Sequence, residues 1–259
     1  MDLSVIIVNY NTASLLRACL SALRQHPLRR GSMDVWVVDN GSQDDSAAMV
    51  GEQFPEVHLL ANEVNRGFAA ANNQAIRLSQ GRYVLLLNPD TEVFPGTLDE
   101  MLRFMDEHPQ AGVVGAQLLN PDGSVQTSCR AFPTLWAVFL RGSGLSRFFP
   151  RSRALRQYLM EDGDHGQTQE VDWLLGACLW MRRRTLDEVG WLDEGFFLYY
   201  EDIDWCYRAR QAGWQIYYLP SARILHRHQR ESARGINKLT WVHVRSIIRL
   251  FRKHDLAWF

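Results

Sequence analysis

Three carboxylates follow an aromatic run late in the chain. The run from Phe196 to Tyr200 leads directly into Glu201 and Asp202, and Asp204 lies two residues further on. Carboxylates beside aromatic side chains lose hydration water, which is costly unless a substrate or an ion interacts with them. We therefore expect the chemistry of the protein to involve this segment.

Two further acidic residues each follow an expected strand. Asp39 comes directly after Val35 to Val38, and Asp90 comes after Tyr83 to Leu87 and an Asn-Pro turn. Ligands of open α/β sheets bind beyond the carboxyl ends of the strands. An Asp behind a turn that proline makes rigid can ligate a divalent cation together with diphosphate oxygens and water. Both residues are therefore ligand candidates.

The elements that would position these residues alternate between short apolar runs and segments with helical spacing. We expect strands at Leu3 to Val8, Asp34 to Val38, Val57 to Leu60, Tyr83 to Leu87 and Val113-Val114, and helices at Ala13 to Gln25, Ser46 to Gln53, Phe68 to Ser79 and Gly96 to His108. This alternation predicts an α/β fold with a mostly parallel central sheet flanked by helices.

The regular pattern stops in the middle of the chain. We expect residues from about Arg130 to Gln169 to be irregular and partly mobile, because they show no clear period. Beyond them we expect a strand-like segment at Val171 to Met181, helices at Arg184 to Val189, Glu201 to Ala212 and Asn237 to Lys253, and strands at Trp214 to Leu219 and Ala222 to Leu225. The chain would then divide into a domain of residues 1–230, with halves at 1–115 and 116–230, and a basic amphipathic helix at 231–259.

The overall composition is that of an ordinary globular protein. Of the 259 residues, 46% are hydrophobic and 22% are charged, which excludes a disordered chain. The net charge of -1 hides a basic segment, because Glu231 is the sole acidic residue between Arg227 and Lys253. This segment is a candidate anion-facing surface. We expect no nucleic-acid partner, because no reader motif accompanies it.

The cysteines and the N-terminus bear on the compartment. The 4 cysteines are far apart and form no CxxC pair, which predicts buried free thiols in a reducing compartment and argues against structural zinc. Asp2 stands where a signal peptide would be basic, and the apolar run Val5 to Val8 is too short for one. No apolar run approaches membrane-spanning length. We expect a cytoplasmic protein, with peripheral contact to the cytoplasmic membrane face as an alternative.

Polar residues at the ends of the first strands could bind a nucleotide. Asp39 and the small polar turn after it could accept hydrogen bonds from a base or ribose, or could simply form a strand-to-helix turn capped by Ser42 or Asp44. After the first strand, Asn11 or Thr12 would cap the next helix, and Tyr10 could stack on a base.

A polar loop that contains Arg66 precedes the small-residue helix beginning near Phe68. A helix N-terminus favours phosphate oxygens, and small residues allow a close approach. The alternative is a well-packed helix beside a solvated arginine.

Taken together, these segments resemble family 2 glycosyltransferases of the GT-A fold, from Val5 to about His226. The residues that carry the resemblance are Val8-Asn9-Tyr10-Asn11, Val37 to Ser42, Asn65-Arg66-Gly67-Phe68, Leu87-Asn88-Pro89-Asp90, Gly176-Ala177-Cys178 and Tyr200-Glu201-Asp202-Ile203-Asp204. The Asn-Pro-Asp form is similar to the rhamnosyltransferase-type members.

The resemblance implies a donor site and a metal. The donor site would include Asn9, Tyr10, Asn11, Asp39, Asn40, Arg66, Gly67, Asn88 and Asp90. The family's metal-binding Asp-x-Asp corresponds to Asn88-Pro89-Asp90, so one strong anionic ligand replaces two, and Mg²⁺ or Mn²⁺ should bind weakly until the diphosphate arrives. His226 matches the family's late metal-binding His, with His228 as a rival.

The resemblance also implies the catalytic base. Glu201-Asp202 matches the family's acidic pair, and we assign the base to Asp202 with Glu201 as its competitor. Removing the proton of a sugar hydroxyl lowers the barrier to its attack, and one base on one face implies inversion. On a helix, Glu201, Asp204 and Arg208 share a face while Asp202 points elsewhere, which favours a structural ion pair between Asp204 and Arg208.

Residues before this pair are candidates for the acceptor side. Gly176 and Ala177 could let a sugar approach the backbone, or could mark a bulge. Asp172 could bind a hydroxyl and Trp173 could stack on a sugar ring, whereas Trp180 is expected in the core.

The sequence thus predicts transfer of a sugar, with rhamnose from dTDP-rhamnose as the candidate, to a hydroxyl of a glycan or lipid-linked glycan. One alternative is a non-catalytic nucleotide-sugar-binding protein. Another is a sugar-1-phosphate nucleotidyltransferase, which would need a Gly-rich basic loop where Asn9 to Thr12 stands. The last helix carries Trp241, Val244, Ile248, Phe251 and Trp258 among basic residues, which suits either an anionic membrane surface or packing on the domain.

Overall fold

The computed structural model describes residues 1–142, 152–160, 164–227 and 238–254. The strands are β1 (Leu3–Asn9), β2 (Met33–Asp39), β3 (His58–Ala61), β4 (Tyr83–Leu87), β5 (Thr91–Val93), β6 (Ala111–Leu119), β7 (Val125–Gln126), β8 (Cys129–Arg130), β9 (Gln169–Glu170), β10 (Trp173–Leu174), β11 (Cys178–Arg182) and β12 (Gln215–His226). The helices are α1 (Ala13–Gln25), α2 (Ser46–Gln53), α3 (Phe68–Leu78), α4 (Thr97–Glu107), α5 (Leu135–Gly142), α6 (Arg153–Leu159), α7 (Arg183–Val189), α8 (Glu201–Gln211) and α9 (Lys238–His254).

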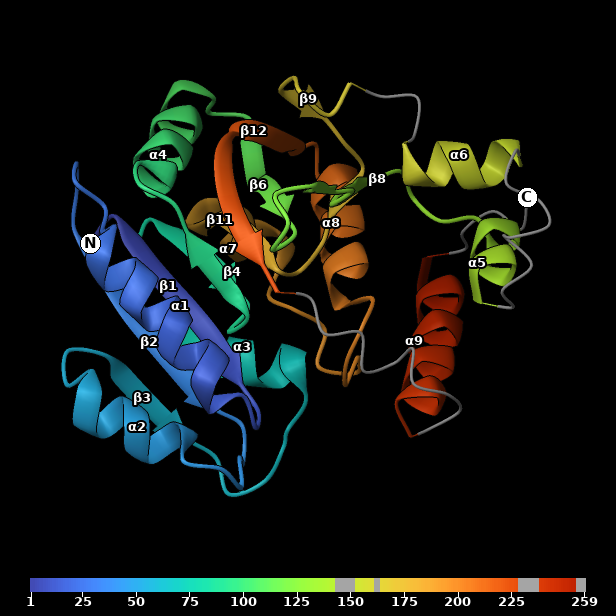
Figure 1. Cartoon of the computed structure of the whole chain (residues 1–259). Coiled ribbons are helices and arrows are strands. Elements are labelled where there is room, and N and C mark those ends of the chain that lie inside the picture. Colours follow the sequence, from blue (N-terminus) through green and yellow to red (C-terminus); the bar gives the residue numbers. More distant parts are fainter. Residues whose placement is uncertain (143–151, 161–163, 228–237, 255–259) are drawn as a thin grey trace.

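The main sheet has the strand order β3-β2-β1-β4-β11-β6-β12-β5, with β7 beside β6 and β9 beside β12 (Figure 1). β3, β2, β1 and β4 are parallel to one another, as are β6 and β12, while β11 and β5 run antiparallel to their neighbours. β8 and β10 form a separate antiparallel pair. The expected α/β fold with a mostly parallel sheet is confirmed.

Helices cover both faces of the sheet because the central strands are apolar on both sides. Val5 of β1 packs in one core with Leu16 of α1 and Met101 of α4. Ile6, the next residue, packs in a second core with Ile76 of α3 and residues of α8 and α9. The sheet therefore lies between α1, α2 and α4 on one side and α3, α7 and α8 on the other (Figure 1).

The start of α1 differs from the sequence-based expectation. Thr12 is the N-cap residue but makes no side-chain cap hydrogen bond, since its hydroxyl donates to Asn9 at 2.6 Å. Asn11 accepts instead from the amide of Gln43. The carboxylate of Asp44 accepts from the first helical amide, that of Ala13, at 3.0 Å. The helix is therefore capped from the loop after β2, which local sequence could not indicate.

Three other expectations need correction. The segment 130–169 contains the helices α5 and α6, which bury apolar residues such as Ala137 and Leu155 in the second core; residues 143–151 and 161–163 of this segment lie outside the described ranges. The expected strand over 171–181 is interrupted between β10 and β11. The two expected strands over 214–225 are one strand, β12, with register shifts. In each case packing against, or strand pairing with, distant segments overrides the local sequence pattern.

The 4 cysteines are buried and free, as predicted. No helix within the described ranges is both long and apolar enough to span a bilayer. The predicted boundary at residue 115 falls inside β6, so the sheet continues across it, and the division into halves remains a prediction. Residues 231–237, His228 and Trp258 lie outside the described ranges.

Candidate active site

The chemically interesting residues gather at the carboxyl edge of the sheet. β1 ends at Asn9, which is in register with Asp39 at the end of β2. β4 runs parallel to β1 and leads into the turn that carries Asp90. β12 ends at His226, which pairs with Thr91 directly after Asp90. Parallel strands thus deliver distant residues to one edge, as the sequence predicts.

Asn9, Asp39 and Ser42 form a closed cluster at this edge. Asp39 Oδ1 accepts from Asn9 Nδ2 at 2.9 Å and from Ser42 Oγ at 2.6 Å, and its Oδ2 accepts from the Ser42 amide at 3.1 Å. Asp39 is 4% exposed and Asn9 is fully buried. Both side chains therefore shape the polar turn, while the ring of Tyr10 next to them is 48% exposed and open to a ligand.

Asn40 connects the end of β2 to the loop before α3. Its Nδ2 donates to Asn65 Oδ1 at 3.0 Å and to the Gly67 carbonyl at 3.3 Å. Its Oδ1 accepts from Asn62 Nδ2 at 3.1 Å and from the Arg66 amide at 3.0 Å. An asparagine amide has two donors and two acceptor lone pairs, so all four are used. Asn40 therefore positions the loop and has no hydrogen-bonding capacity left for the nucleotide.

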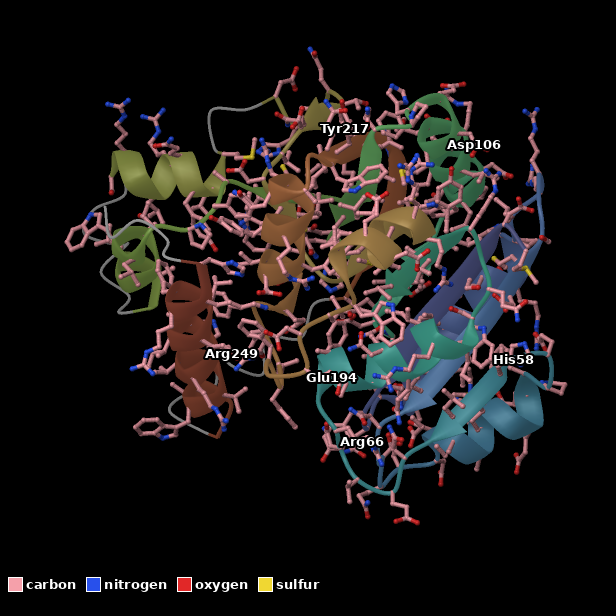
Figure 2. All side chains as sticks on the ribbon, turned by 180° about the vertical axis from the view of Figure 1, so that it is seen from behind. His58, Arg66, Asp106, Glu194, Tyr217 and Arg249 are labelled. Atoms are coloured by element: carbon pink, nitrogen blue, oxygen red, sulfur yellow. The ribbon has the colours of Figure 1, made fainter. Side chains whose placement is uncertain are left out.

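The loop presents Arg66 to solvent at the same edge. The Arg66 side chain is exposed (Figure 2), and among the described residues no hydrogen bond or ion pair of its guanidinium is found. Gly67 has a φ of 87°, and a Cβ there would stand 2.6 Å from the carbonyl oxygen of Phe197. Glycine is therefore needed for the loop to lie against the segment that leads to Glu201.

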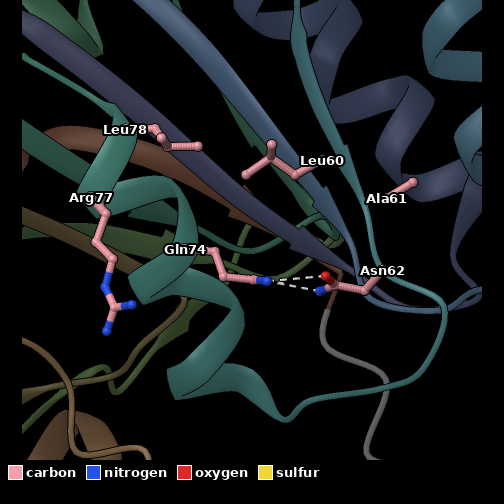
Figure 3. A pocket seen from close by; sticks show the side chains of 6 residues that line it. All are labelled: Leu60, Ala61, Asn62, Gln74, Arg77 and Leu78. Atoms are coloured by element: carbon pink, nitrogen blue, oxygen red, sulfur yellow. Dashed lines mark hydrogen bonds between the residues drawn. The ribbon is translucent and has the colours of Figure 1, made fainter.

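A shallow pocket lies behind this loop, between β3 and α3 (Figure 3). Asn62 and Gln74 form two hydrogen bonds across it, at 2.9 and 3.1 Å. Since Asn62 also donates to Asn40, this pair supports the loop from behind. The pocket contains none of the carboxylates discussed above, so we place the candidate site at the sheet edge.

Asp90 and His226 face each other at that edge. Asp90 Oδ1 lies 3.5 Å from His226 Nε2. The Asp90 oxygen is buried and receives no hydrogen bond from any residue in the described ranges. A buried carboxylate oxygen without a donor suggests that something absent from the protein chain interacts with it.

Gln126, on β7, sets the orientation of the His226 ring. Its Nε2 donates to Asn120 Oδ1 at 2.7 Å and to the His226 carbonyl at 2.8 Å. Its Oε1 is then the acceptor that stands 2.7 Å from His226 Nδ1. In the neutral ring Nδ1 must carry the proton, so Nε2 directs a lone pair toward Asp90. This is the tautomer in which histidine ligates metals through Nε2.

The chemistry of this pair fits a divalent cation. A carboxylate oxygen suits Mg²⁺ or Mn²⁺, and an imidazole nitrogen favours Mn²⁺. Within the described ranges there is no group of three or more His, Cys, Asp or Glu that could hold a metal. A bound diphosphate and water could supply further ligands. Asn88, two residues before Asp90, is held in this turn through its backbone by Ala177 and Thr91.

Glu201 and Asp202 begin α8 and differ in their surroundings. Glu201 is 4% exposed, and its Oε2 has no hydrogen-bond partner in the described part of the chain. Burial, reinforced by the charge of Asp202, raises the pKa of Glu201 well above 4.5. Burial also raises the pKa of Asp202, to about 6, although hydrogen bonds from the amides of Gly176 and Ile203 act to lower it. Burial therefore favours a proton on Glu201, while Asp202 accepts two amide hydrogen bonds that favour its charged form.

Gly176 and Ala177 join the two halves of the site. The Gly176 amide donates to Asp202 Oδ2 at 2.9 Å, and the Ala177 carbonyl accepts from the Asn88 amide at 3.0 Å. Consecutive residues thus contact the carboxylate of Asp202 and the turn that carries Asp90. A Cβ at position 176 would stand 3.4 Å from Asp202 Oδ2, so glycine also keeps the approach to that oxygen open.

Two expected acceptor contacts are occupied by the protein itself. Asp172 accepts from Arg210 Nη1 at 2.8 Å and from the Phe132 amide at 2.9 Å. Trp173 is 4% exposed and its Nε1 donates to the Ala131 carbonyl. The Trp173 ring therefore packs in the core and cannot stack on a sugar.

The ion pair expected within α8 is present. Arg208 Nε lies 2.9 Å from Asp204 Oδ2, and Asp204 is fully buried. Trp180 also lies in the core, as expected. The sequence did not predict three supporting contacts, because no local signal distinguishes their residues from other polar loop residues. They are the contact of Ser42 with Asp39, the Asn62–Gln74 pair and the contact of Gln126 with His226.

The comparison with known families agrees with this geometry. A family model described as "Glycosyl transferase family 2" matches residues 4–190. The chain belongs to this family. Within it, an N-acetylglucosaminyl-diphospho-decaprenol L-rhamnosyltransferase of Mycobacterium tuberculosis is 32% identical over 274 residues, covering 99% of this chain and 86% of that protein. The rhamnosyltransferase-like resemblance expected from the sequence is confirmed.

Solved glycosyltransferases share the fold. The mannosyltransferase PcManGT from Pyrobaculum calidifontis, in complex with GDP-Man and Mn²⁺, aligns with a TM-score of 0.65 at 20% identity, covering 98% of this chain and 64% of that one. GalNAc-T7 with UDP, GalNAc and Mn²⁺ aligns with a TM-score of 0.71 at 15% identity, covering 97% and 48%. This chain therefore spans less than two thirds of the length of either solved chain. Its fold is GT-A, as expected.

Proposed function

We propose that the protein is an inverting, metal-dependent glycosyltransferase that moves a sugar from a nucleotide-diphosphate donor to a hydroxyl of a glycan or lipid-linked glycan. One observation carries the proposal. The carboxylate of Asp202 is held by the amide of Gly176, and the next residue, Ala177, holds the turn that ends in Asp90. A base and a diphosphate-binding position therefore meet at one edge of the sheet.

In this reaction Asp202 accepts the proton of the acceptor hydroxyl as its oxygen attacks the anomeric carbon. The bond from that carbon to the diphosphate breaks, and its electron pair leaves with the diphosphate. Attack from the side opposite the leaving group inverts the configuration. A positioned general base contributes about 10²–10⁴-fold in rate.

The remaining residues bind and orient the donor. Asp90 and His226 would hold the cation, which neutralises charge on the diphosphate when bound. Arg66 adds an exposed positive charge for the same oxygens. Tyr10 offers an exposed ring on which the base can stack. Asn9, Asn11, Asp39, Asn40, Gly67 and Asn88 shape the loops that surround the donor.

We propose rhamnose from dTDP-rhamnose as the transferred sugar and a lipid-linked glycan as the acceptor. Both rest on the 32% identical relative, whose name specifies L-rhamnosyl transfer and a diphospho-decaprenol carrier. Gly176 and Ala177 are then the backbone positions beside the acceptor, since they adjoin the base.

A screen of nucleotide sugars by thermal shift in the presence of Mn²⁺ tests this function. A donor at 100 times its Kd should stabilise the protein by about 2.7 kcal/mol. We expect dTDP-rhamnose to raise the melting temperature more than UDP-GlcNAc or GDP-mannose, and a chelator to remove most of the shift. The bound donor should be hydrolysed slowly or transferred to an added acceptor.

The same screen separates the alternatives. Binding without hydrolysis or transfer would favour a non-catalytic nucleotide-sugar-binding protein. Pyrophosphate release from a sugar 1-phosphate and a nucleoside triphosphate would favour a nucleotidyltransferase. Absence of any shift with every donor would contradict all three functions.

We also propose that the outer face of α9 contacts the surface of an anionic membrane. Trp241, Val244 and Ile248 are 72%, 42% and 45% exposed, at helical positions i, i+3 and i+7. Arg245 and Arg252 are exposed beside them. An apolar stripe flanked by arginines suits the headgroup region of anionic lipids, and a lipid-linked acceptor would lie there. Such contact would place the protein at the cytoplasmic membrane face.

Sedimentation with vesicles tests this surface. Reversing both arginines, Arg245→Glu and Arg252→Glu, should weaken binding to phosphatidylglycerol vesicles at low salt by roughly 30-fold or more, because each basic residue contributes about 1 kcal/mol. The control Arg17→Glu reverses an exposed arginine on α1, across the sheet, and should leave binding unchanged. Failure of the wild-type protein to bind these vesicles at low salt would refute the contact.

A further inference from the structure

The inner face of α9 contacts the segment that leads to the catalytic pair. Ser246 Oγ donates to the Leu198 carbonyl at 2.9 Å, and Ser246 is 4% exposed. The His243 ring lies against the rings of Tyr199 and Tyr200, with centroid separations of 5.3 and 5.0 Å. A helix 40 residues further along the chain thus holds the backbone just before the base.

That backbone is in a conformation that needs external support. Tyr199 and Tyr200 have φ angles of 67° and 71°, in the left-handed region that residues with a Cβ rarely adopt. Tyr200 is also the N-cap residue of α8, so its conformation sets the direction in which Asp202 leaves the helix start. Such strain persists where the surrounding structure fixes it, and it gathers at functional sites.

Charged residues at the C-terminal end of α9 hold the segment on both sides of the tyrosines. Asp193 accepts from Arg249 at 2.9 Å and from Lys253 at 2.6 Å. Asp204, fully buried, accepts from Lys253 at 2.7 Å and from His254 at 2.6 Å. Residues 193 and 204 bracket the base, so α9 spans the whole segment that carries it.

These contacts form one stripe along the helix. His243, Ser246, Leu250 and Lys253 are spaced by three or four residues, which places them on one face. Leu250 is fully buried in the second core. This face packs against the domain. The face that carries Trp241 is a different one and is exposed.

The donor side of the site holds the same segment from the opposite direction. The Phe68 amide, at the start of α3, donates to the Phe197 carbonyl at 2.7 Å. Phe197 and Leu198 are consecutive, so one carbonyl is bound by the helix that borders the donor loop and the next is bound by Ser246. The backbone before Tyr199 is therefore fixed from two sides.

We propose that α9 positions the catalytic base: Ser246 and His243 hold Tyr199 and Tyr200 in the left-handed conformation that aims Asp202 at the acceptor hydroxyl. Both are positioning residues, since their contacts are with the segment and not with the reacting atoms. The inference rests on the proposed role of Asp202 as the base. It gives the C-terminal helix a part in turnover that is independent of any contact with a membrane.

The variants Ser246→Ala and His243→Leu test the proposal. We expect each to lower kcat about 10- to 100-fold, since displacement of a reacting group by about 1 Å can cost that much. The donor Kd, measured by titration with Mn²⁺ present, should stay within about twofold of wild type, because the donor-binding residues lie on other elements. Ser246→Thr keeps the hydroxyl and should recover most of the lost turnover.

A matched control separates positioning from stability. Ser79 also buries a hydroxyl that donates to a carbonyl, that of Ile76 at 3.1 Å, and is 7% exposed. It lies at the end of α3 that is remote from Gly67. Ser79→Ala should lower the melting temperature with kcat unchanged. If Ser246→Ala and Ser79→Ala affect kcat equally, α9 has no positioning role.

A double variant distinguishes the possible failures. In an Asp202→Asn background there is no base to position, so adding Ser246→Ala should cost little further turnover. If Asp202→Asn alone stays active, the proposed function of Asp202 fails. If Asp202→Asn is inactive but both α9 variants keep wild-type kcat, the proposed function stands and this inference alone fails. Should Ser246→Ala not fold, the same comparison with His243→Leu decides.

Discussion

Asp202→Asn should lower kcat by about 10²–10⁴-fold while leaving donor binding nearly unchanged. The amide cannot accept the proton of the acceptor hydroxyl, yet it has almost the size of the carboxylate that Gly176 and Ile203 hold. Transfer from the donor identified by the thermal-shift screen gives kcat, and titration of the same donor gives Kd. The surface variant Asp187→Asn, on α7, is the control for loss of a carboxylate outside the site.

Glu201→Gln tests the choice between the two neighbours. Because burial raises the pKa of Glu201 well above 4.5 and so favours its protonated form, glutamine imitates that form, and turnover should stay close to wild type. In both proteins kcat/KM should fall as the pH drops through about 6, where Asp202 takes up a proton and can no longer act as a base. If Glu201→Gln were inactive and Asp202→Asn active, Glu201 rather than Asp202 would be the base.

The sheet edge could be predicted because its signals are local. Apolar runs that end at Val8, Val38 and Leu87 indicate strands by composition alone, and parallel strands of an α/β sheet place their ends together. The polar turn after each run then marks the ligand side. The aromatic run also marks Asp202 itself, whereas the resemblance to a known family added His226 and the role of Asp202 as the base.

The partners of those residues could not be predicted, because they are set by tertiary contacts between distant segments. Gln126 reaches His226 across 100 residues of sequence, and Ser246 reaches Leu198 across 48. The side chain of Asn40 is of a type that can bind a nucleotide, yet all four hydrogen-bonding positions of its amide are used within the protein. Whether a polar side chain binds substrate or holds a loop depends on how many of its hydrogen bonds the fold already satisfies.

The short helices α5 and α6 were missed for a related reason. Their apolar residues, such as Ala137, Leu155 and Tyr158, are buried against the second core, but each helix has only 7 or 8 residues. Isolated helices of that length are marginal in water, so their stability comes from packing rather than from propensity. A periodicity search has too few turns to detect them.

Asp90→Asn should abolish the dependence of donor binding on Mn²⁺. Asp90 supplies the one anionic oxygen of the proposed metal site, and that oxygen has no hydrogen-bond donor in the described part of the chain. We expect Mn²⁺ affinity, measured from the spectrum of the free ion by electron paramagnetic resonance with the nucleoside diphosphate present, to fall by more than about 100-fold. The control Asp122→Asn removes a carboxylate from the adjacent β6–β7 turn and should leave the affinity unchanged. If Asp90→Asn binds Mn²⁺ as well as wild type, the cation site lies elsewhere.

Gln126→Leu gives a graded version of the same test, because it leaves both proposed ligands in place. Without the acceptor at 2.7 Å from Nδ1, the His226 ring loses the contact that fixes its tautomer and direction. Loss of such a supporting hydrogen bond typically costs about 10–100-fold in metal affinity. Gln126→Glu keeps an acceptor for Nδ1–H and should retain more affinity than leucine does. We expect Mn²⁺ affinity to be weakest in Asp90→Asn, intermediate in Gln126→Leu and strongest in Gln126→Glu, as for a site in which the protein orients one imidazole and one carboxylate. Equal affinities for the two Gln126 variants would show that the ring is held by other contacts.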